Sequence, residues 1–177
     1  FGYIMMGPMQ VMLPKFAIQQ LGMSEMARGS LLGTLAPSLI AGGVAAMILA
    51  RHIPNGAAIL IATVLAGLSF LMLGLSHSVA MATCFLVAVG LFGGLAISLM
   101  VAGIQTQAQD AVRGRVMAMY TLISQVVPAA SGLVGGLMLT QLDVSTAMVA
   151  VGACIMLFAL CNTAWMRALR HYPGVAR

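Results

Sequence analysis

Charged residues are scarce in this sequence. Its 177 residues include only eight lysines and arginines and three acidic residues, or 6% charge. Soluble domains carry about 25% charged residues, which form the surface that water solvates. An ordinary soluble domain is therefore excluded. Because 62% of the residues are hydrophobic, the sequence predicts an integral membrane protein whose partner and solvent is the lipid bilayer.

Residue patterns for catalysis or metal binding are also missing. The sequence has no GxSxG, HExxH or CxxC motif and no pair of carboxylates inside an apolar run, and its histidines fall in polar joints or the tail. We therefore expect neither an enzyme nor a bound metal or cofactor. Cys84, Cys154 and Cys161 all lie inside apolar runs. They are interpreted as small core residues rather than ligands or disulfide partners.

Long apolar runs dominate the rest of the chain. A bilayer core of about 30 Å needs roughly 20 apolar residues per helix. The runs are too long for the alternating strands of an outer-membrane barrel. The sequence therefore predicts an all-α, polytopic bundle of six transmembrane helices. The expected spans are 1–18, 30–50, 57–76, 79–103, 115–140 and 146–167, with a polar hinge at 104–114 and a tail at 168–177.

Arginine is distributed unequally between the two ends of these spans. One side carries six arginines, whereas the other carries Lys15, Arg28, Glu25 and Asp143. Positive charge favours the cytoplasmic side, so both ends of the segment are expected in the cytoplasm. The placement just beyond apolar runs suits lipid headgroups and topology, and nucleic acid is not an expected partner. The six arginines are Arg51, Arg113, Arg115, Arg167, Arg170 and Arg177.

The hinge at 104–114 holds the densest group of charges. Asp110 can cap the helix that follows it, because a carboxylate accepts backbone N–H groups and suits the helix dipole. Arg113 and Arg115 then lie at the headgroup boundary, and Gly114 between them allows a neighbouring helix to come close. Two interpretations stay open here. In the first, Asp110 caps the helix and the arginines only set the orientation of the chain in the membrane. In the second, the charges form a cytoplasmic gate that closes when the outer side is open.

Small residues and prolines recur in the second and fifth spans. Glycine pairs in "AGGVAA" and "SGLVGG", and in "GLFGGLA" of the fourth span, allow helix backbones to approach closely in lipid. Pro37 precedes the glycines at 42–43, and Pro128 precedes those at 135–136. Because the second and fifth spans are the middle spans of successive triplets, the pattern indicates an inverted three-plus-three repeat.

A few polar side chains lie within the apolar spans. Positions three, four or seven apart share one face of a helix. Such a face can line a cavity for a large, mostly apolar ligand, or it can hydrogen-bond to another helix. The candidate substrate-binding residues are Tyr3, Met6 and Gln10 in the first span, and Tyr120 and Ser124, followed by Gln125, in the fifth.

Two stretches carry a family resemblance. "MLPKFAIQQLGMSEMARGSLLGTLAPSLIAGG" and "IQTQAQDAVRGRVMAMYTLISQVVPAASGLVGG" resemble the second half of a Major Facilitator Superfamily transporter, in the bacterial efflux branch that includes the enterobactin exporter. The resemblance implies spans seven to twelve of a twelve-span inner-membrane protein, and therefore a missing N-terminal six-span half. It also implies alternating access, with a cavity lined by the first, second, fourth and fifth spans. The joint "ARHIPNG" keeps Arg51 of the family's cytoplasmic motif but lacks its aspartate.

The sequence thus leads to a functional hypothesis and an alternative. The hypothesis is half of a secondary transporter that exports small amphipathic molecules, such as drugs or siderophores. Its cytoplasmic gate is formed by Arg51, Asp110, Arg113, Gly114 and Arg115. The alternative is a six-span membrane subunit that transports nothing and binds a protein partner through its glycine faces.

Overall fold

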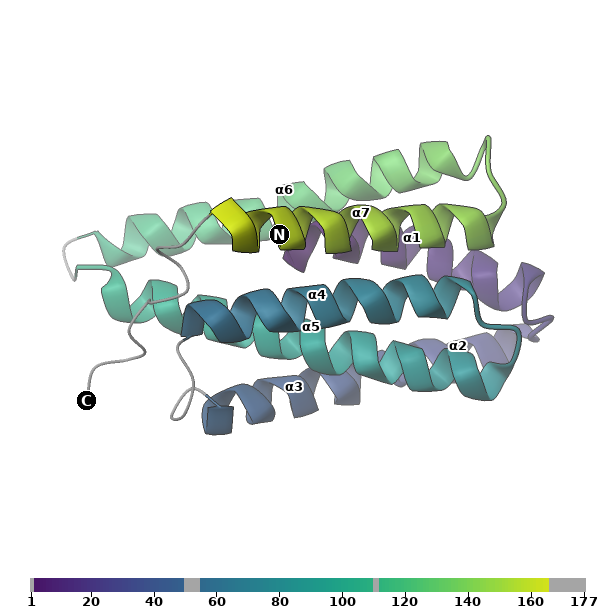
Figure 1. The fold of residues 1–177 in the computed structure, drawn as a ribbon, viewed down its shortest axis with the longest axis horizontal. Coiled ribbons are helices and arrows are strands. Elements are labelled where there is room, and N and C mark those ends of the chain that lie inside the picture. The colour runs from purple at the N-terminus through teal and green to yellow at the C-terminus, as the bar shows by residue number, and fades with distance from the viewer. Residues whose placement is uncertain (1, 50–54, 110–111, 166–177) are drawn as a thin grey trace.

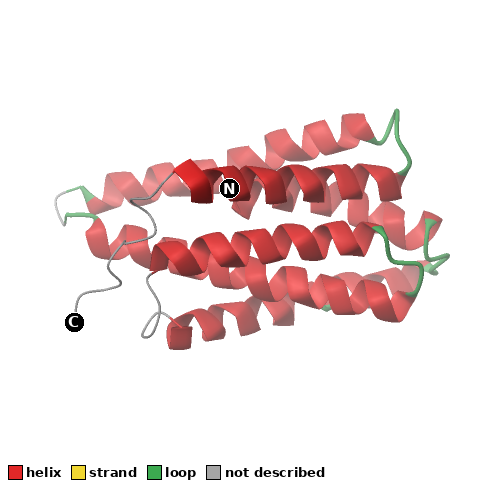
Figure 2. Ribbon diagram, viewed as in Figure 1, coloured by secondary structure: helices red, strands yellow, loops and turns green. Residues whose placement is uncertain are grey.

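A computed structural model describes residues 2–49, 55–109 and 112–165 (Figure 1). In these ranges every regular element is an α-helix, and no strand is present (Figure 2). The backbone hydrogen bonds of a helix are satisfied within the helix, as a lipid environment requires. The helices are α1 (Gly2–Gln19), α2 (Glu25–Gly33), α3 (Leu35–Leu49), α4 (Asn55–Gly74), α5 (Val79–Gln107), α6 (Arg113–Met138) and α7 (Val144–Trp165).

The helices run along the long axis of an elongated bundle. The α1–α2, α4–α5 and α6–α7 connections lie at one end, whereas α3 and α5 finish, and α4 and α6 begin, at the other (Figure 1). Arg113 and Arg115 therefore lie at the opposite end from Glu25 and Asp143. This arrangement separates the described charges into the two groups expected from the sequence. The assignment of one group to the cytoplasm stays a prediction.

Five helical segments are long and apolar enough to cross a membrane, in the part of the chain that the structure describes. The protein is thus a helical bundle of the multi-pass membrane type. The segments are Glu25–Leu49, Gly56–Gly74, Val79–Gln107, Arg113–Met138 and Val144–Cys161. The expected first span forms α1 but is not among the five. Its 18 residues include Gln10, Lys15 and Gln19, which lower its mean hydropathy.

The expected second span begins earlier than the sequence suggested. Ser24 caps α2, because its Oγ accepts a hydrogen bond from the Ala27 amide at 3.4 Å. Glu25 and Arg28, interpreted as part of a polar joint, therefore belong to a helix. At Thr34 the chain makes a short interruption, where the Thr34 hydroxyl donates to the Leu31 carbonyl at 2.7 Å. Residues 25–49 nevertheless form a single candidate span.

The main hydrophobic core lies where α1 meets α4, α5 and α7. The side chains of Met12 and Phe16 from α1 are fully buried there, together with Phe70 from α4 and Met148 from α7. These large residues fill the centre because α1 packs between the other helices over its second half. The core therefore holds α1 against α4, α5 and α7.

Helix pairs meet through small residues. The most extensive pairings are α3 with α5, α4 with α5, α4 with α7 and α1 with α6. A Cβ added at Gly42 of α3 would lie 2.1 Å from the Leu91 carbonyl oxygen of α5, and one at Gly94 would lie 2.3 Å from that of Leu39. At Gly152 of α7 an added Cβ would lie 2.7 Å from the Leu71 amide nitrogen. The expected close approach of backbones at glycines is confirmed at these positions.

The cysteines differ from the sequence-based interpretation. Cys84, Cys154 and Cys161 have free thiols and exposed side chains, so their interpretation as core residues was wrong. In a membrane bundle the outer surface faces hydrocarbon. An apolar sequence context therefore does not distinguish a buried residue from one on the outer face.

Candidate functional site

Helices α1 and α6 are in backbone contact at Gly7. A Cβ added at Gly7 would lie 2.1 Å from the Pro128 carbonyl oxygen and 2.4 Å from the Gly132 amide nitrogen. One helical turn further, a Cβ at Gly135 would lie 3.1 Å from Cα of Pro8. Any side chain at Gly7 would force the helices apart. The glycine therefore sets the distance between α1 and α6.

A groove runs along this contact. It has a volume of about 920 Å³ and is open on one side. On α1, Tyr3, Gly7 and Val11 follow one another at intervals of four residues, and Met6 and Gln10 form a neighbouring row. Residues four apart share a helix face. The spacing on α1 therefore produces one continuous wall.

The wall on α6 is built in the same way from two adjacent rows. Both rows have four-residue spacing, so each is a stripe along the helix. Proline and glycines in the first row leave space and allow the contact with α1. The first row is Ser124, Pro128, Gly132 and Gly136, and the second is Gln125, Ala129, Leu133 and Leu137.

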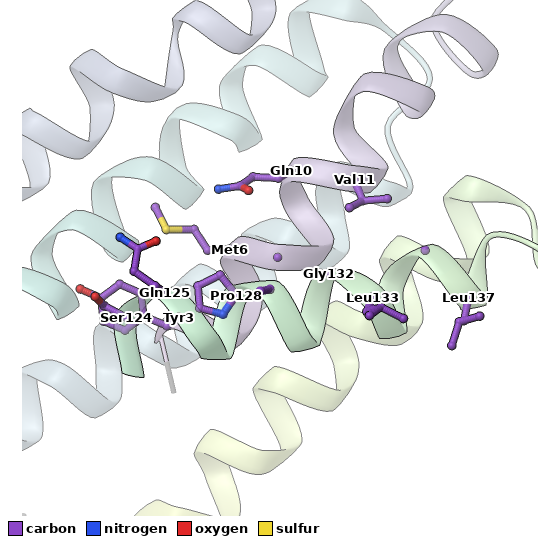
Figure 3. A pocket seen from close by; sticks show the side chains of 13 residues that line it. Tyr3, Met6, Gln10, Val11, Ser124, Gln125, Pro128, Gly132, Leu133 and Leu137 are labelled. Carbon is purple, nitrogen blue, oxygen red and sulfur yellow. The ribbon is translucent and has the colours of Figure 1, made fainter. Parts of the chain in front are cut away.

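The groove changes character along its length. Tyr3, Ser124 and Gln125 lie together at one end, whereas Val11, Leu133 and Leu137 lie toward the other (Figure 3). The polar end is nearer to the start of α6, and hence to the hinge. Gln125 of α6 and Gln10 of α1 are exposed. The groove is therefore amphipathic, with hydrogen-bonding groups at the hinge end and an apolar opposite end.

Two tyrosines join α1 to α6 at the polar end. The hydroxyl groups of Tyr3 and Tyr120 hydrogen-bond to each other, and their rings meet edge to face with centroids 5.9 Å apart. Tyr120 begins the row that continues through Ser124 and Pro128. Edge-to-face packing is a favoured arrangement of aromatic rings. The pair therefore links the two walls at one end of the groove.

Serine hydroxyl groups on α6 donate to their own helix. The Ser124 hydroxyl donates to the Thr121 carbonyl at 2.7 Å, and the Ser131 hydroxyl donates to the Pro128 carbonyl at 3.2 Å. A hydroxyl has one proton to donate and two lone pairs that accept. In the groove, Ser124 thus presents an acceptor rather than a donor.

The structure brings the candidate substrate-binding residues together. Tyr3, Met6, Gln10 and Ser124 all line the groove, and Tyr120 contacts Tyr3 without lining it. Whether they bind a substrate stays a prediction. The sequence analysis missed the contribution of Gly7, Pro128 and Gly132. The four-residue spacing of Pro128 and Gly132 was a usable signal, but these two residues were interpreted only as repeat and packing features, and Gly7 received no interpretation.

The candidate gate is only partly described. Arg51 and Asp110 lie outside the described residues, so neither the gate nor capping by Asp110 is tested. Val112 occupies the N-cap position of α6 and makes no side-chain cap hydrogen bond. Gly114 has no described atom within 4 Å of an added Cβ. Among the described residues, the expected approach of a helix at Gly114 is therefore absent.

Arg113 and Arg115 are exposed in the first turn of α6. A helix N-terminus has a partial positive charge, and cations there are unfavourable by about 0.3–1 kcal/mol. Arg113 and Arg115 therefore do not stabilise α6 through its helix dipole. Their position suits contact with lipid headgroups or with another protein segment.

A second, smaller cavity of about 220 Å³ lies between α1, α4 and α7. Its lining is nearly all apolar, and the Thr63 hydroxyl in it donates to the Ile59 carbonyl at 2.8 Å.

Residues 2–49, 55–109 and 112–165 contain no group of three or more histidine, cysteine or acidic side chains placed to hold a metal ion.

Comparison with known proteins gives no assignment, because no family model, curated protein or solved structure matches the chain. The site must therefore be interpreted from its own geometry. An open amphipathic groove within a membrane bundle is suited to binding a ligand of mixed polarity.

Proposed function

We propose that this chain is the C-terminal half of a secondary transporter of the Major Facilitator type, and that it exports small amphipathic molecules across a bacterial inner membrane. The groove between α1 and α6 forms one side of the substrate cavity. The N-terminal half of the transporter covers its open side, and the cavity opens alternately to the two sides of the membrane.

The observation that carries the proposal is the set of polar side chains that line the groove. Tyr3, Gln10, Ser124 and Gln125 come from two helices and border one space of about 920 Å³. Polar side chains inside a membrane bundle usually face its interior or a cavity. Gln10 and Gln125 are exposed and have no hydrogen-bond partner in the described structure beyond their own helices. A ligand provides a reason for their presence.

The pairing of helices supports an inverted repeat. In an inverted repeat of two triplets, α1 is equivalent to α5, and α3 is equivalent to α6. The α1–α6 contact is then equivalent to the α5–α3 contact, and both are among the most extensive contacts in the bundle. Both pairs also meet backbone to backbone at glycine, at Gly7 with Pro128 and at Gly94 with Leu39. Equivalent helices run in opposite directions in the bundle (Figure 1). These are features of transporters built from inverted triplets.

The test is the accumulation of N-phenyl-1-naphthylamine, a neutral fluorescent dye with one N–H group, in bacteria that express the complete gene. We expect expression to lower accumulation, and Gln10→Ala or Gln125→Ala to restore much of it. Gln19→Ala is the matched control, because Gln19 is an exposed glutamine at the end of α1 and does not line the groove. Equal membrane levels of all variants must be verified by immunoblotting. Unchanged accumulation on expression of the normal protein, with a panel of further dyes, would contradict export.

The alternative function is a non-transporting subunit that binds a protein partner. One observation favours it: among the described helices, α6 packs extensively only on α1, so much of its apolar surface is exposed. The exposed residues are Met119, Leu122, Ile123, Val126, Leu133, Val134 and Leu137. Co-purification of one stoichiometric membrane partner, together with an absence of dye export, would favour this function.

A further inference from the structure

We infer that the α1–α6 groove selects an uncharged amphipathic ligand whose polar end donates hydrogen bonds, such as a hydroxyl or N–H group. This inference rests on the proposed function and specifies the substrate class. It follows from counting the donors and acceptors at the polar end of the groove. The count begins with the hydroxyl protons, most of which are already used inside the protein.

The Ser124 hydroxyl gives its proton to the Thr121 carbonyl at 2.7 Å. In the hydrogen bond between Tyr3 and Tyr120, one of the two hydroxyl protons is consumed. A hydroxyl that has donated its proton still has lone pairs that accept. The serine and one tyrosine are therefore acceptors toward anything in the groove, whereas the other tyrosine keeps its proton and remains a donor.

Proline adds a backbone acceptor at the same place. Pro128 lies inside α6 and lines the groove together with Ser124, four residues before it. Proline has no N–H, so it removes the helical hydrogen bond to the carbonyl of the residue four positions earlier. The carbonyl of Ser124 therefore lacks its usual helical donor. Ser124 thus offers two acceptors, its carbonyl and its hydroxyl oxygen.

The two glutamines do not reverse this excess. Each carboxamide has one acceptor oxygen and one donor NH₂ group, so Gln10 and Gln125 can pair with a ligand of either kind. With one tyrosine hydroxyl and both carboxamide NH₂ groups counted as donors, acceptor groups still outnumber donor groups in the groove. A ligand that donates hydrogen bonds satisfies them, whereas a ligand with acceptors alone leaves the Ser124 oxygens unpaired.

Charge on the ligand is disfavoured. No described residue that lines the groove carries a charge, and an uncompensated ion within a membrane costs several kcal/mol. The apolar end supplies the other half of the specificity. From Ser124 to Leu137 the groove follows α6 for about 20 Å at 1.5 Å per residue, which accommodates an extended apolar tail beside Val11, Leu133 and Leu137.

Three probes with the same octyl tail separate these features: 4-octylphenol donates a hydrogen bond, 4-octylanisole does not, and 4-octylbenzoate is anionic. Binding is measured with the complete protein in nanodiscs, by displacement of tritiated 4-octylphenol, with empty nanodiscs subtracted. We expect the phenol to bind about fivefold more tightly than the anisole, as for one net hydrogen bond, and the benzoate to bind most weakly.

Variants then locate the acceptors. Pro128→Ala restores an N–H group for the Ser124 carbonyl, and should weaken phenol binding about fivefold while anisole binding stays the same. Ser124→Ala removes the hydroxyl acceptor and serves if Pro128→Ala is poorly folded. Pro37→Ala is the matched control, since Pro37 is exposed in the first turn of α3 and outside the groove.

Equal binding of phenol and anisole, tighter binding of the benzoate, or unchanged phenol binding in both Pro128→Ala and Ser124→Ala would overturn the inference. These outcomes are distinct from failure of the proposed function. The nanodisc experiment measures equilibrium binding, whereas export is measured independently by N-phenyl-1-naphthylamine accumulation in cells.

Discussion

Tyr3 and Tyr120 are 117 residues apart in the sequence, and their hydroxyl groups hydrogen-bond across the contact between α1 and α6. Their rings are arranged edge to face at a centroid distance of 5.9 Å. The pair lies at the polar end of the groove, one helical turn before Ser124. It therefore couples the stability of the α1–α6 contact to the shape of the candidate site.

The tyrosine pair should show a measurable coupling energy. Tyr3→Phe and Tyr120→Phe each remove a hydroxyl and keep the ring, so each should lower the free energy of unfolding by about 1 kcal/mol. The double variant should lose less than the sum, because the first substitution already breaks the shared hydrogen bond. Unfolding in mixed micelles with increasing SDS measures all four proteins. Strictly additive losses would show that the hydroxyl groups do not interact.

Gly7→Ala should destabilise the protein strongly. Its Cβ would lie 2.1 Å from the Pro128 carbonyl oxygen, and backbone atoms on both helices must move to relieve the clash. Overpacking of this kind costs about 1–3 kcal/mol. Gly103→Ala in α5 is the matched control, because no described atom lies within 4 Å of its added Cβ. Thermal unfolding in detergent should show a clear loss for Gly7→Ala and none for Gly103→Ala, and similar values for the two would argue against the tight α1–α6 contact.

Ser145 links the start of α7 to the end of α4, since its hydroxyl donates to the Gly74 carbonyl. Ser145→Ala removes this contact between helices, and should lower the free energy of unfolding by about 1 kcal/mol. Ser30→Ala is the control, because the Ser30 hydroxyl donates to Ala27 within its own helix at 2.7 Å and is exposed. The same SDS titration compares the two variants. A larger loss for Ser30→Ala would contradict the importance of the α4–α7 link.

Sidedness can be measured with single cysteines at the two ends of the bundle. Gln107 ends α5 at the hinge, and Leu142 lies in the α6–α7 connection at the opposite end; both are exposed (Figure 1). After Cys84, Cys154 and Cys161 are replaced by alanine, an impermeant maleimide should label Gln107→Cys only in inside-out vesicles. It should label Leu142→Cys in intact spheroplasts. The reverse pattern would show that the hinge is not cytoplasmic.

The hinge arginines distinguish a gate from a topology signal. Arg113→Gln and Arg115→Gln together should slow dye export by up to about fivefold if these charges make gate contacts, since an exposed ion pair contributes at most about 1 kcal/mol. Arg28→Gln, at the other end of the bundle, is the control. Export rates are normalised to the amount of inserted protein. Normal export in the double variant would leave only the role in topology.

Helix periodicity made part of the candidate site predictable. Tyr3 and Gln10 are seven residues apart, and Tyr120 and Ser124 are four apart, so each pair had to share a helix face. Nothing local in the sequence specified that these two faces meet. Glycine shows the same limit: Gly7 and Gly114 are alike as residues, yet one touches the backbone of α6 and the other lies in open space among the described residues.

The amino-acid sequence by itself determined the membrane environment, the helical class and the approximate helix positions. These follow from composition and from the need of each helix to satisfy its own backbone in lipid. Only the tertiary structure decided that α1 pairs with α6, that a groove of about 920 Å³ runs between them, and that Tyr3 contacts Tyr120. Lipid is as apolar as the helix surfaces, so hydrophobicity does not select helix partners. That selection depends on close packing of small residues and on hydrogen bonds between helices, which are properties of shapes that meet in space.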